Sequence, residues 1–340
     1  MHVSVAKTSI VAAAVIALLT SCGGGSPTPA TPLAFQPNQI RNVKHQTTCR
    51  CLYVTNSGDN SISVYRVGSS GNAAPSQYIY GSSTDLSSPI GVAVDSSGNI
   101  YVANYGDNSV SVYAAGATGN VMPTAIINGS NTQLYEPAGV AIDPVNGDIY
   151  VDNYAGGTSG AGSVTFYAPG SDGNVAPLGT IAGSNTGIYG NTGLTLDSSG
   201  NIYVPINTNN INVYAAGSTG NVAPTQTIGG SFTNLDEPTQ VALDSSLNIY
   251  AANYAAPSVT AYPAGANGNV PPSVDLSGTK TKLRGSIGVA LDSHGNVYVS
   301  NYLNNTITIY SASSNGDVKP SGILKGKKTK LDEPFGIAIR

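Results

Sequence analysis

A repeat of roughly fifty residues fills this chain from residue 51 to its end, and it limits the possible folds more than any other feature. One tyrosine marks the same point of six copies, at spacings of 47 to 53 residues: Tyr53, Tyr101, Tyr150, Tyr203, Tyr250 and Tyr298. A second tyrosine and a Gly-x-x-x-Pro motif recur behind each of these marks. Self-similarity at this period indicates a solenoid, a propeller or a repeat array.

Each copy predicts four short strands. In the second copy, runs rich in Val, Ile and Tyr with a period of two lie at 91–95, 99–104 and Ser109–Tyr113, and a fourth run follows Pro123. The segment 95–99 combines Asp, Gly and Asn, which suit a hairpin turn. Four antiparallel strands in about 40–50 residues make one propeller blade.

The two ends of the repeat region predict a closed ring. The first copy begins at residue 52 with a second strand that has no first strand before it, and the chain stops at residues 336–340 with an unpaired first strand. Pairing the two fragments leaves no open sheet edge. The sequence therefore predicts an all-β, six-bladed β-propeller with four antiparallel strands per blade, closed by pairing of the N- and C-terminal strands.

Two stretches resemble known propeller repeats. GVAVD followed by GNIYVAN, within residues 91–104, is similar to the NHL repeat, and YVTN at residues 53–56 resembles the YVTN repeat of bacterial and archaeal surface proteins. The resemblance covers the chain after about residue 50 and implies the propeller fold. Such propellers include binding scaffolds, lactonases and lyases, so the fold does not choose among them.

The N-terminal segment predicts secretion. Residues 10–19 are an apolar run too short to span a bilayer, and the four residues ending in Cys22 resemble the lipobox of bacterial lipoproteins. By this resemblance Cys22 is lipidated, and Gly23 after it implies the outer membrane if the host is Gram-negative. The alternative is an ordinary secretory peptide cleaved near Ser21. Stable anchoring needs more than one acyl chain, which lipoproteins carry.

We expect three parts in the chain: a signal peptide at 1–22, a linker at 23–48 and the propeller at 49–340. The linker is rich in Gly, Pro, Ser and Thr and is expected to be disordered. At its end His45, Cys49 and Cys51 stand close together. A disulfide or plain thiols are one interpretation of this cluster, and a Zn or Cu site without a visible fourth ligand is the other.

Charge is scarce and unevenly placed. Charged residues make up 9% of the chain, against the usual quarter, and no Lys or Arg lies between Arg66 and Lys280. Equivalent blade-to-blade loops of neighbouring blades then carry a basic group: Lys280, Lys282, Arg284, Lys325, Lys327, Lys328 and Lys330. This group is either a patch for phosphate, anionic glycan or lipid head groups, or a solvated charge run. The acidic balance and the absence of interleaved aromatic and basic residues argue against nucleic acid.

The face that carries the loop after the second strand is the expected ligand face. Five second strands end in asparagine, with Ile206 as the exception, and four of these asparagines precede a tyrosine: Asn56, Asn104–Tyr105, Asn153–Tyr154, Asn253–Tyr254 and Asn301–Tyr302. The asparagines either settle the turns through hydrogen bonds to the backbone or form, with the tyrosines, a ring for a sugar or peptide around the channel mouth.

The sequence offers little for catalysis. After loss of the signal peptide only His45 and His294 remain, and His294 falls in the hairpin on the face opposite the expected ligand face. With one usable His, we expect neither a Ser/His/Asp triad nor a His-based metal cluster. Weak candidates for a divalent ion are Glu136, Asp152, Glu237 and Glu333. Gluconolactonase-like propellers, which these residues resemble in type only, bind such an ion, and Ca²⁺ enters only under that alternative.

We therefore expect a lipid-anchored, extracytoplasmic binding or interaction scaffold of the cell envelope that needs no cofactor. Its ligand would be a glycan, a peptide, a protein or an anionic envelope polymer. The alternative is a divalent-metal-dependent lactonase or lyase, although the residues favour a protein that is not an enzyme.

Overall fold

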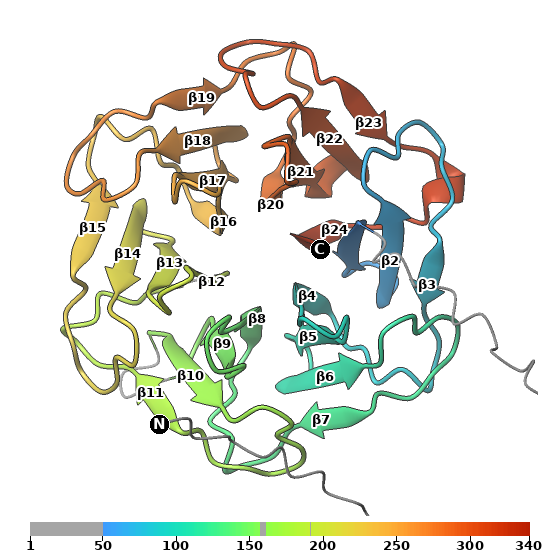
Figure 1. Cartoon of the computed structure of the whole chain (residues 1–340), viewed down its shortest axis with the longest axis vertical. Helices are drawn as coiled ribbons and strands as arrows, with labels where there is room; N and C mark the ends of the chain where they lie inside the picture. The colour runs from blue at the N-terminus through green and yellow to red at the C-terminus, as the bar shows by residue number, and fades with distance from the viewer. Residues whose placement is uncertain (1–49, 157–160, 191) are drawn as a thin grey trace, which may run out of the picture. The chain divides into compact units, whose positions relative to one another are not determined.

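The computed structural model describes residues 50–340 except 157–160 and 191, and it contains six sheets of four antiparallel strands arranged in a ring (Figure 1). The predicted fold is confirmed. The expected signal peptide and linker, with Cys22, His45 and Cys49, lie outside the described residues.

Blade 1 joins the two ends of the chain, and blades 2 to 6 follow in sequence order. Blade 1 contains β24 (Pro334–Ile339), β1 (Cys51–Asn56), β2 (Ser61–Arg66) and β3 (Gln77–Ile79). Blade 2 contains β4 (Pro89–Val94), β5 (Ile100–Asn104), β6 (Ser109–Tyr113) and β7 (Ala125–Ile127). Blade 3 contains β8 (Pro137–Ile142), β9 (Ile149–Asn153), β10 (Ser163–Tyr167) and β11 (Gly179–Ile181). Blade 4 contains β12 (Thr195–Leu196), β13 (Ile202–Ile206), β14 (Asn210–Tyr214) and β15 (Gln226–Gly229).

Blade 5 contains β16 (Pro238–Leu243), β17 (Ile249–Asn253), β18 (Ser258–Tyr262) and β19 (Val274–Leu276). Blade 6 contains β20 (Ser286–Leu291), β21 (Val297–Asn301), β22 (Thr306–Tyr310) and β23 (Gly322–Leu324). Two 3₁₀ turns complete the described elements, η1 (Tyr302–Asn304) and η2 (Lys327–Thr329). Within the described part of the chain, then, no helix has the length and apolar character needed to cross a bilayer.

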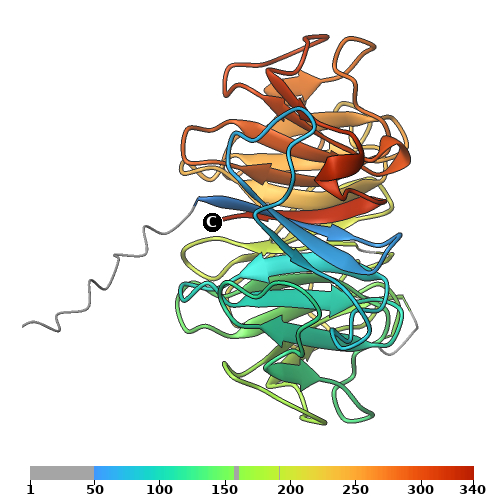
Figure 2. The same ribbon diagram turned by 90° about the vertical axis from the view of Figure 1, so that its right-hand side faces the viewer.

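The ring closes as the sequence predicts. β24 lies beside β1 in Figure 2, and the two strands pair in antiparallel register from Leu52 with Ile339 to Asn56 with Pro334. Beyond the strands, the amide of Cys51 donates to the carbonyl of Arg340 over 2.8 Å, and the amide of Arg340 donates back over 3.0 Å. The last strand of the chain is therefore the innermost strand of blade 1.

The hydrophobic core lies between the blades. Ile100 and Val102 of β5 belong to a buried cluster with blade 1, whereas Tyr101 and Ala103 belong to a cluster with blade 3. Successive side chains of a strand point to opposite faces of its sheet. Each blade thus buries both faces against its neighbours. The third strands accordingly bury Ser and Thr at alternate positions as well as their apolar residues, as Ser109 and Ser111 show in β6.

Two hydrogen bonds on the outer side of the ring recur in the blades. The tyrosine that ends the third strand is buried, and its hydroxyl donates to a threonine carbonyl in a blade-to-blade loop, as Tyr310 does to Thr281 over 2.6 Å. The same bond joins Tyr65–Thr329, Tyr113–Thr84, Tyr167–Thr132, Tyr214–Thr186 and Tyr262–Thr233.

The second bond is formed by the residue that follows the glycine of the Gly-x-x-x-Pro motif. The Asn120 Oδ1 of blade 2 accepts the amide of Ser83 over 2.8 Å in the loop that leaves blade 1, while Gly119 pairs with the outer strand of blade 1. Equivalent bonds come from Asn72, Asn174, Asn221, Asn269 and Asp317. Each blade is thereby joined to the preceding one along its outer edge.

Because neighbouring strands are antiparallel, the loops emerge on two faces. The loops between second and third strands and the loops between blades share one face, which we call the top face. The loops between first and second strands share the other, the bottom face. The amide of Glu136, in a blade-to-blade loop, accordingly bonds to Asn108 Oδ1, in a loop between second and third strands.

Candidate functional site

The five asparagines of the expected ligand face are fully buried. The Asn104 Nδ2 donates to the hydroxyls of Ser109 and Ser111 over 3.0 and 2.9 Å, and its Oδ1 accepts the amide of Ser87 over 3.3 Å. Asn56, Asn153, Asn253 and Asn301 make the same kinds of bond. These amides join the second strand to the blade-to-blade loop, which is the structural interpretation of the motif, and they do not face the channel mouth.

Blade 4 departs from this pattern at the position where the sequence has Ile206. Ile206 is buried and carries no amide, and Asn212 on the third strand instead donates to the carbonyls of Thr186 and Gly187 over 3.4 Å each. The blade-to-blade loop before blade 4 is therefore hydrogen-bonded to the third strand of that blade rather than to its second strand.

The four tyrosines that follow the asparagines lie on the top face and are half-buried. Tyr105 and Tyr154 of neighbouring blades meet edge to face, with ring centroids 6.1 Å apart at 65°. Tyr302 meets Phe335 of the closing strand in the same way, at 6.1 Å and 78°. The tyrosines come from blades 2, 3, 5 and 6, and three of them, Tyr154, Tyr254 and Tyr302, line one cavity with Phe335.

A cavity of about 300 Å³ opens between these rings on the top face. This volume is at the small end of the range for ligand sites. Its lining includes Tyr154, Tyr254, Tyr302, Phe335, Glu237 and Asn207. Thr192, Ile287 and Phe335 also line the narrow part of the channel underneath, so they form the floor of the cavity.

The channel is narrow below this floor. Five blades have a glycine at the same point of the repeat, within the innermost strand or, for Gly193, shortly before it: Gly91, Gly139, Gly193, Gly288 and Gly336. A Cβ on Gly91 would lie 2.8 Å from the Cα of Gly139, and one on Gly336 would lie 2.3 Å from the carbonyl oxygen of Ile90. Adjacent backbones thus touch at this level, and no larger residue fits without a shift of main-chain atoms.

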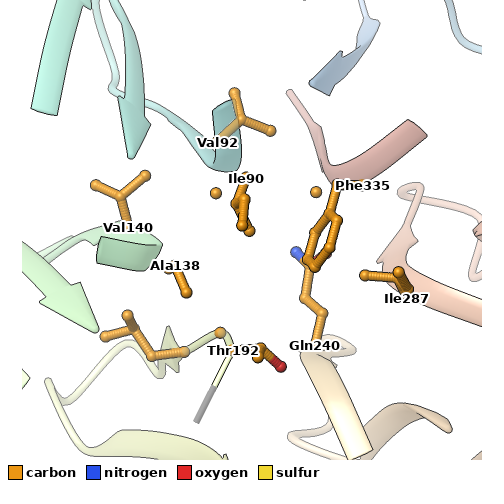
Figure 3. A pocket seen from close by; sticks show the side chains of 13 residues that line it. Ile90, Val92, Ala138, Val140, Thr192, Gln240, Ile287 and Phe335 are labelled. Carbon is orange, nitrogen blue, oxygen red and sulfur yellow. The ribbon is translucent and has the colours of Figure 1, made fainter. Parts of the chain in front are cut away.

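Gln240 occupies the sixth of these positions. In Figure 3 its side chain extends from blade 5 toward Phe335, on the far side of the opening from Val140. The Gln240 Nε2 donates to the carbonyl of Ile337 over 2.9 Å, and its Oε1 accepts the amide of Ile337 over 3.3 Å. One side chain therefore joins blade 5 to the closing strand in the narrow part of the channel.

Three glutamates occupy one point of the repeat, directly before the innermost strand: Glu136, Glu237 and Glu333. They belong to blades 3, 5 and 1, and they are the only glutamates in the sequence. Each has a left-handed backbone, with φ of 49° or 50°, and each amide donates to the Oδ1 of an asparagine in a neighbouring loop. All three therefore surround the top end of the channel in alternate blades.

Two of these glutamates lie beside a tyrosine hydroxyl. Burial, together with the carboxylate of Glu136, raises the pKa of Tyr105, and burial together with Glu333 raises the pKa of Tyr302. Glu237 has Asn207 at the corresponding place in blade 4. Among the residues that the structure describes, nothing forms a hydrogen bond or ion pair with the Glu237 carboxylate.

The fourth acidic candidate, Asp152, lies inside blade 3. Its side chain is completely buried, and burial raises the pKa of the carboxyl well above the ordinary value of 3.8. The backbone amide of Gly193 offsets this rise only in part, and no side chain in the described part of the chain bonds to either carboxyl oxygen. In that part, no three acidic, His or Cys side chains are close enough to share a metal ion, so the four candidates do not form one centre.

The seven basic residues lie in the two equivalent loops that the sequence indicates. Lys282 and Lys330 have the same left-handed φ, 64° and 59°, as Gln133 and Asn234 in the corresponding loops. The Lys280 Nζ is 3.8 Å from a carboxyl oxygen of Asp317, and the Lys330 Nζ is 5.9 Å from the centre of the Tyr78 ring. A role in binding anions stays a prediction for this group.

Comparison with known proteins agrees with the fold. Residues 86–113 match the NHL repeat family model, which confirms the resemblance for that copy. A protein of unknown function from Bacteroides caccae is 14% identical with a TM-score of 0.62, covering 86% of this chain and 99% of its own. A chain of a nidogen–laminin complex is 16% identical with a TM-score of 0.59, covering 85% and 97%. At these identities the similarity concerns the fold alone. No curated protein has significant sequence similarity to this chain.

Proposed function

We propose that this six-bladed propeller with NHL-type repeats is an extracytoplasmic binding scaffold, and that its ligand enters the top-face cavity. The observation that carries the proposal is the top-face cavity, whose lining combines three tyrosines with one carboxylate that no described residue pairs. Amphipathic rings and a few placed polar groups are the usual lining of a ligand site.

The lining favours binding over catalysis. Glu237 is the acidic residue in the cavity wall, and the described lining contains no His, Lys or Cys that would pair with it in proton transfer. The fold similarity supports a scaffold in a general way, because a chain of this fold occurs in a nidogen–laminin complex.

The proposal includes a lipid anchor at Cys22 in the envelope. The described chain begins at Arg50, beside the C-terminus and on the bottom face, since Cys51 pairs with Arg340 there. A segment that precedes Arg50 in the chain therefore joins the propeller on the face opposite the cavity.

The anchor is tested by Cys22→Ser. The variant should lose acyl labelling and move from the membrane to the soluble fraction, whereas Cys49→Ser should keep both properties. Membrane retention of Cys22→Ser without acyl label would contradict the lipoprotein proposal.

The binding site is tested by screening the full chain, in detergent, against envelope glycans, peptides and anionic polymers. A ligand of the cavity should bind Tyr254→Ala much more weakly than the unchanged protein. Val145→Ser is the matched control, because Val145 is 68% exposed on the bottom face. Equal loss of binding in both variants, or loss in Val145→Ser alone, would place the ligand elsewhere.

A further inference from the structure

We propose that the top-face cavity is a site for an organic ammonium group, with Glu237 as its counter-ion and the tyrosine rings as its wall. The inference rests on the proposed function and specifies the chemistry of the ligand. A free amine and the side chain of a lysine in a partner polypeptide both supply this group.

The aromatic wall suits a cation. Tyr154, Tyr254 and Tyr302 reach the same cavity from blades 3, 5 and 6, and Phe335 adds a fourth ring. The face of an aromatic ring is electronegative and attracts ammonium groups within about 6 Å of its centre, and cages of such rings recognise quaternary ammonium ligands. Three rings around one small volume can contact such a group from several sides.

Glu237 supplies the negative charge. Its backbone is fixed, because its amide donates to Asn209 Oδ1 over 2.8 Å and its carbonyl accepts the amide of Tyr254 over 3.1 Å. The left-handed conformation there favours Gly or Asn, and blade 6 has Gly285 at this point with φ of 61°. The fold therefore does not require a glutamate. No described residue neutralises the carboxylate, which leaves it free to pair with a ligand.

The charge of the cavity wall has the same sign. Blades 3 to 5, which provide most of the wall, contain no Lys or Arg, because none occurs between Arg66 and Lys280. The basic group lies on the same face in the loops that lead to blades 6 and 1, and none of its residues lines the cavity. Glu237 is the charged residue of the lining, so the cavity wall attracts a cation rather than a carboxylate or phosphate.

The cavity suits an organic cation better than a metal ion. No three acidic, His or Cys side chains of the described residues lie close enough to bind a metal, and Ile287, Pro238 and Phe335 present apolar surface to the ligand. Hard divalent ions require six or more oxygen ligands. Methyl or methylene groups next to the charged nitrogen would instead contact this apolar surface.

Isothermal titration of the full chain in detergent with choline tests the inference. We expect a dissociation constant in about the millimolar range, as for other ligands of few atoms. The neutral isostere 3,3-dimethylbutan-1-ol, which replaces the charged nitrogen by carbon, should bind at least about tenfold more weakly. Equal binding of the two compounds would overturn the proposal without any variant of the protein.

Variants then assign the charge and the rings. Glu237→Gln should weaken choline binding about fivefold, as expected for one exposed ion pair, and Tyr254→Ala about tenfold. Asp148→Asn is the matched control, since Asp148 lies in a bottom-face hairpin. Unfolding curves show that each variant is folded. Unchanged binding in folded Glu237→Gln, or Ca²⁺ binding that displaces choline, would overturn the assignment.

Two further titrations distinguish a free amine from the lysine side chain of a polypeptide as the source of the cation. A short peptide with one lysine should displace choline if the partner is a polypeptide, and its Nε-acetylated form should not. Displacement by cadaverine but not by the peptide would indicate a free amine. Failure of choline, cadaverine and the peptide to bind would overturn the inference. If the envelope screen still gave a Tyr254-dependent ligand, the binding scaffold would stand.

Discussion

The outer side of the ring and the channel mouth are both built from the six copies of the repeat, but the copies are alike on the outer side and differ at the mouth. On the outer side the copies agree: each third strand ends in a buried tyrosine bonded to a threonine carbonyl. At the mouth they disagree, because glutamates occupy alternate blades and one glutamine replaces a glycine. Positions at which the copies have the same residue are those that the fold requires in every blade.

This difference separates structural from candidate functional residues without an alignment of homologues. A blade needs the same bonds wherever it stands in the ring, so a structural residue recurs in most copies. A ligand contacts the whole mouth at once and does not repeat with the blades. Residues that break the symmetry and line the cavity, such as Glu237, are therefore the candidates for ligand binding.

The largest effect should follow loss of the shared closure. Deletion of residues 335–340 removes most of β24 and exposes β1 as an edge strand. We expect the free energy of unfolding to fall by at least about 3 kcal/mol, because each buried Val/Ile-class side chain contributes about 1.5–3 kcal/mol. Deletion of six residues within 24–48 is the control. An unchanged denaturant midpoint in the first variant would mean that the ring is closed in another way.

A methyl group in the glycine ring should have the next largest effect. Gly91→Ala places a Cβ 2.8 Å from the Cα of Gly139, and crowding of backbone atoms of this kind costs about 1–3 kcal/mol. Gly106→Ala is the matched control, because its nearest neighbour is the movable hydroxyl of Ser87. Equal stability of the two variants, measured by urea unfolding, would show that the innermost strands can separate freely.

The same substitution in the two regions compares them directly. Tyr113→Phe leaves a buried carbonyl of Thr84 without its donor and should cost about 1–1.5 kcal/mol. Tyr254→Phe at the mouth should change stability by less than about 0.5 kcal/mol. A larger cost at Tyr254 would assign the mouth tyrosines to the fold.

The acidity of Asp152 adds a pH test inside blade 3. Because its pKa is raised on folding, the folded protein holds a proton that the unfolded chain loses above pH 3.8. The free energy of unfolding should therefore fall as pH increases from 3.8 to the raised pKa. Asp152→Asn removes this dependence. The melting temperature of the variant, relative to that of the unchanged protein, should therefore be higher at pH 7 than at pH 4. A parallel pH profile of both proteins would mean that the carboxyl is solvated or paired.

The basic group on blades 6 and 1 should have the smallest effect on stability and act on binding alone. Lys280, Lys282, Lys328 and Lys330 are the residues expected to bind anionic polymers. If they do, dextran sulfate should bind more weakly as added salt shortens the Debye length to about 8 Å. The fourfold Lys→Gln variant should lose most of this binding. If the group serves only as solvated charge, neither change will alter it.

The sequence alone predicts the fold well, because the period, the strand pattern and the incomplete ends all concern local chemistry that recurs six times. The assignment of the top face also follows from strand order. The asparagines show the limit of this reasoning: Asn104 precedes a loop on the ligand face, yet its amide turns inward to Ser109 and Ser111. Which way a side chain points depends on hydroxyls of the next strand.

The cavity could not be predicted, because its volume depends on how far half-buried rings lean over the channel. Two signals for it were nevertheless present in the sequence. All three glutamates fall on one point of the repeat, and Gln240 is the one residue with a long side chain in a row of glycines. Aligning the copies position by position, and then asking which positions disagree, would have found both.

The position of β1 has a mechanical consequence. A pull transmitted along the chain from the N-terminal side reaches the propeller at Arg50 and acts along β1, which lies between β24 and β2. Both ladders would be loaded in shear, so many hydrogen bonds share the force before any one breaks. Resistance to forced unfolding is governed by the unfolding rate. A ring closed from both chain ends thus places its N-terminal strand in the interior of a sheet, where a pull along the chain is least able to peel it away.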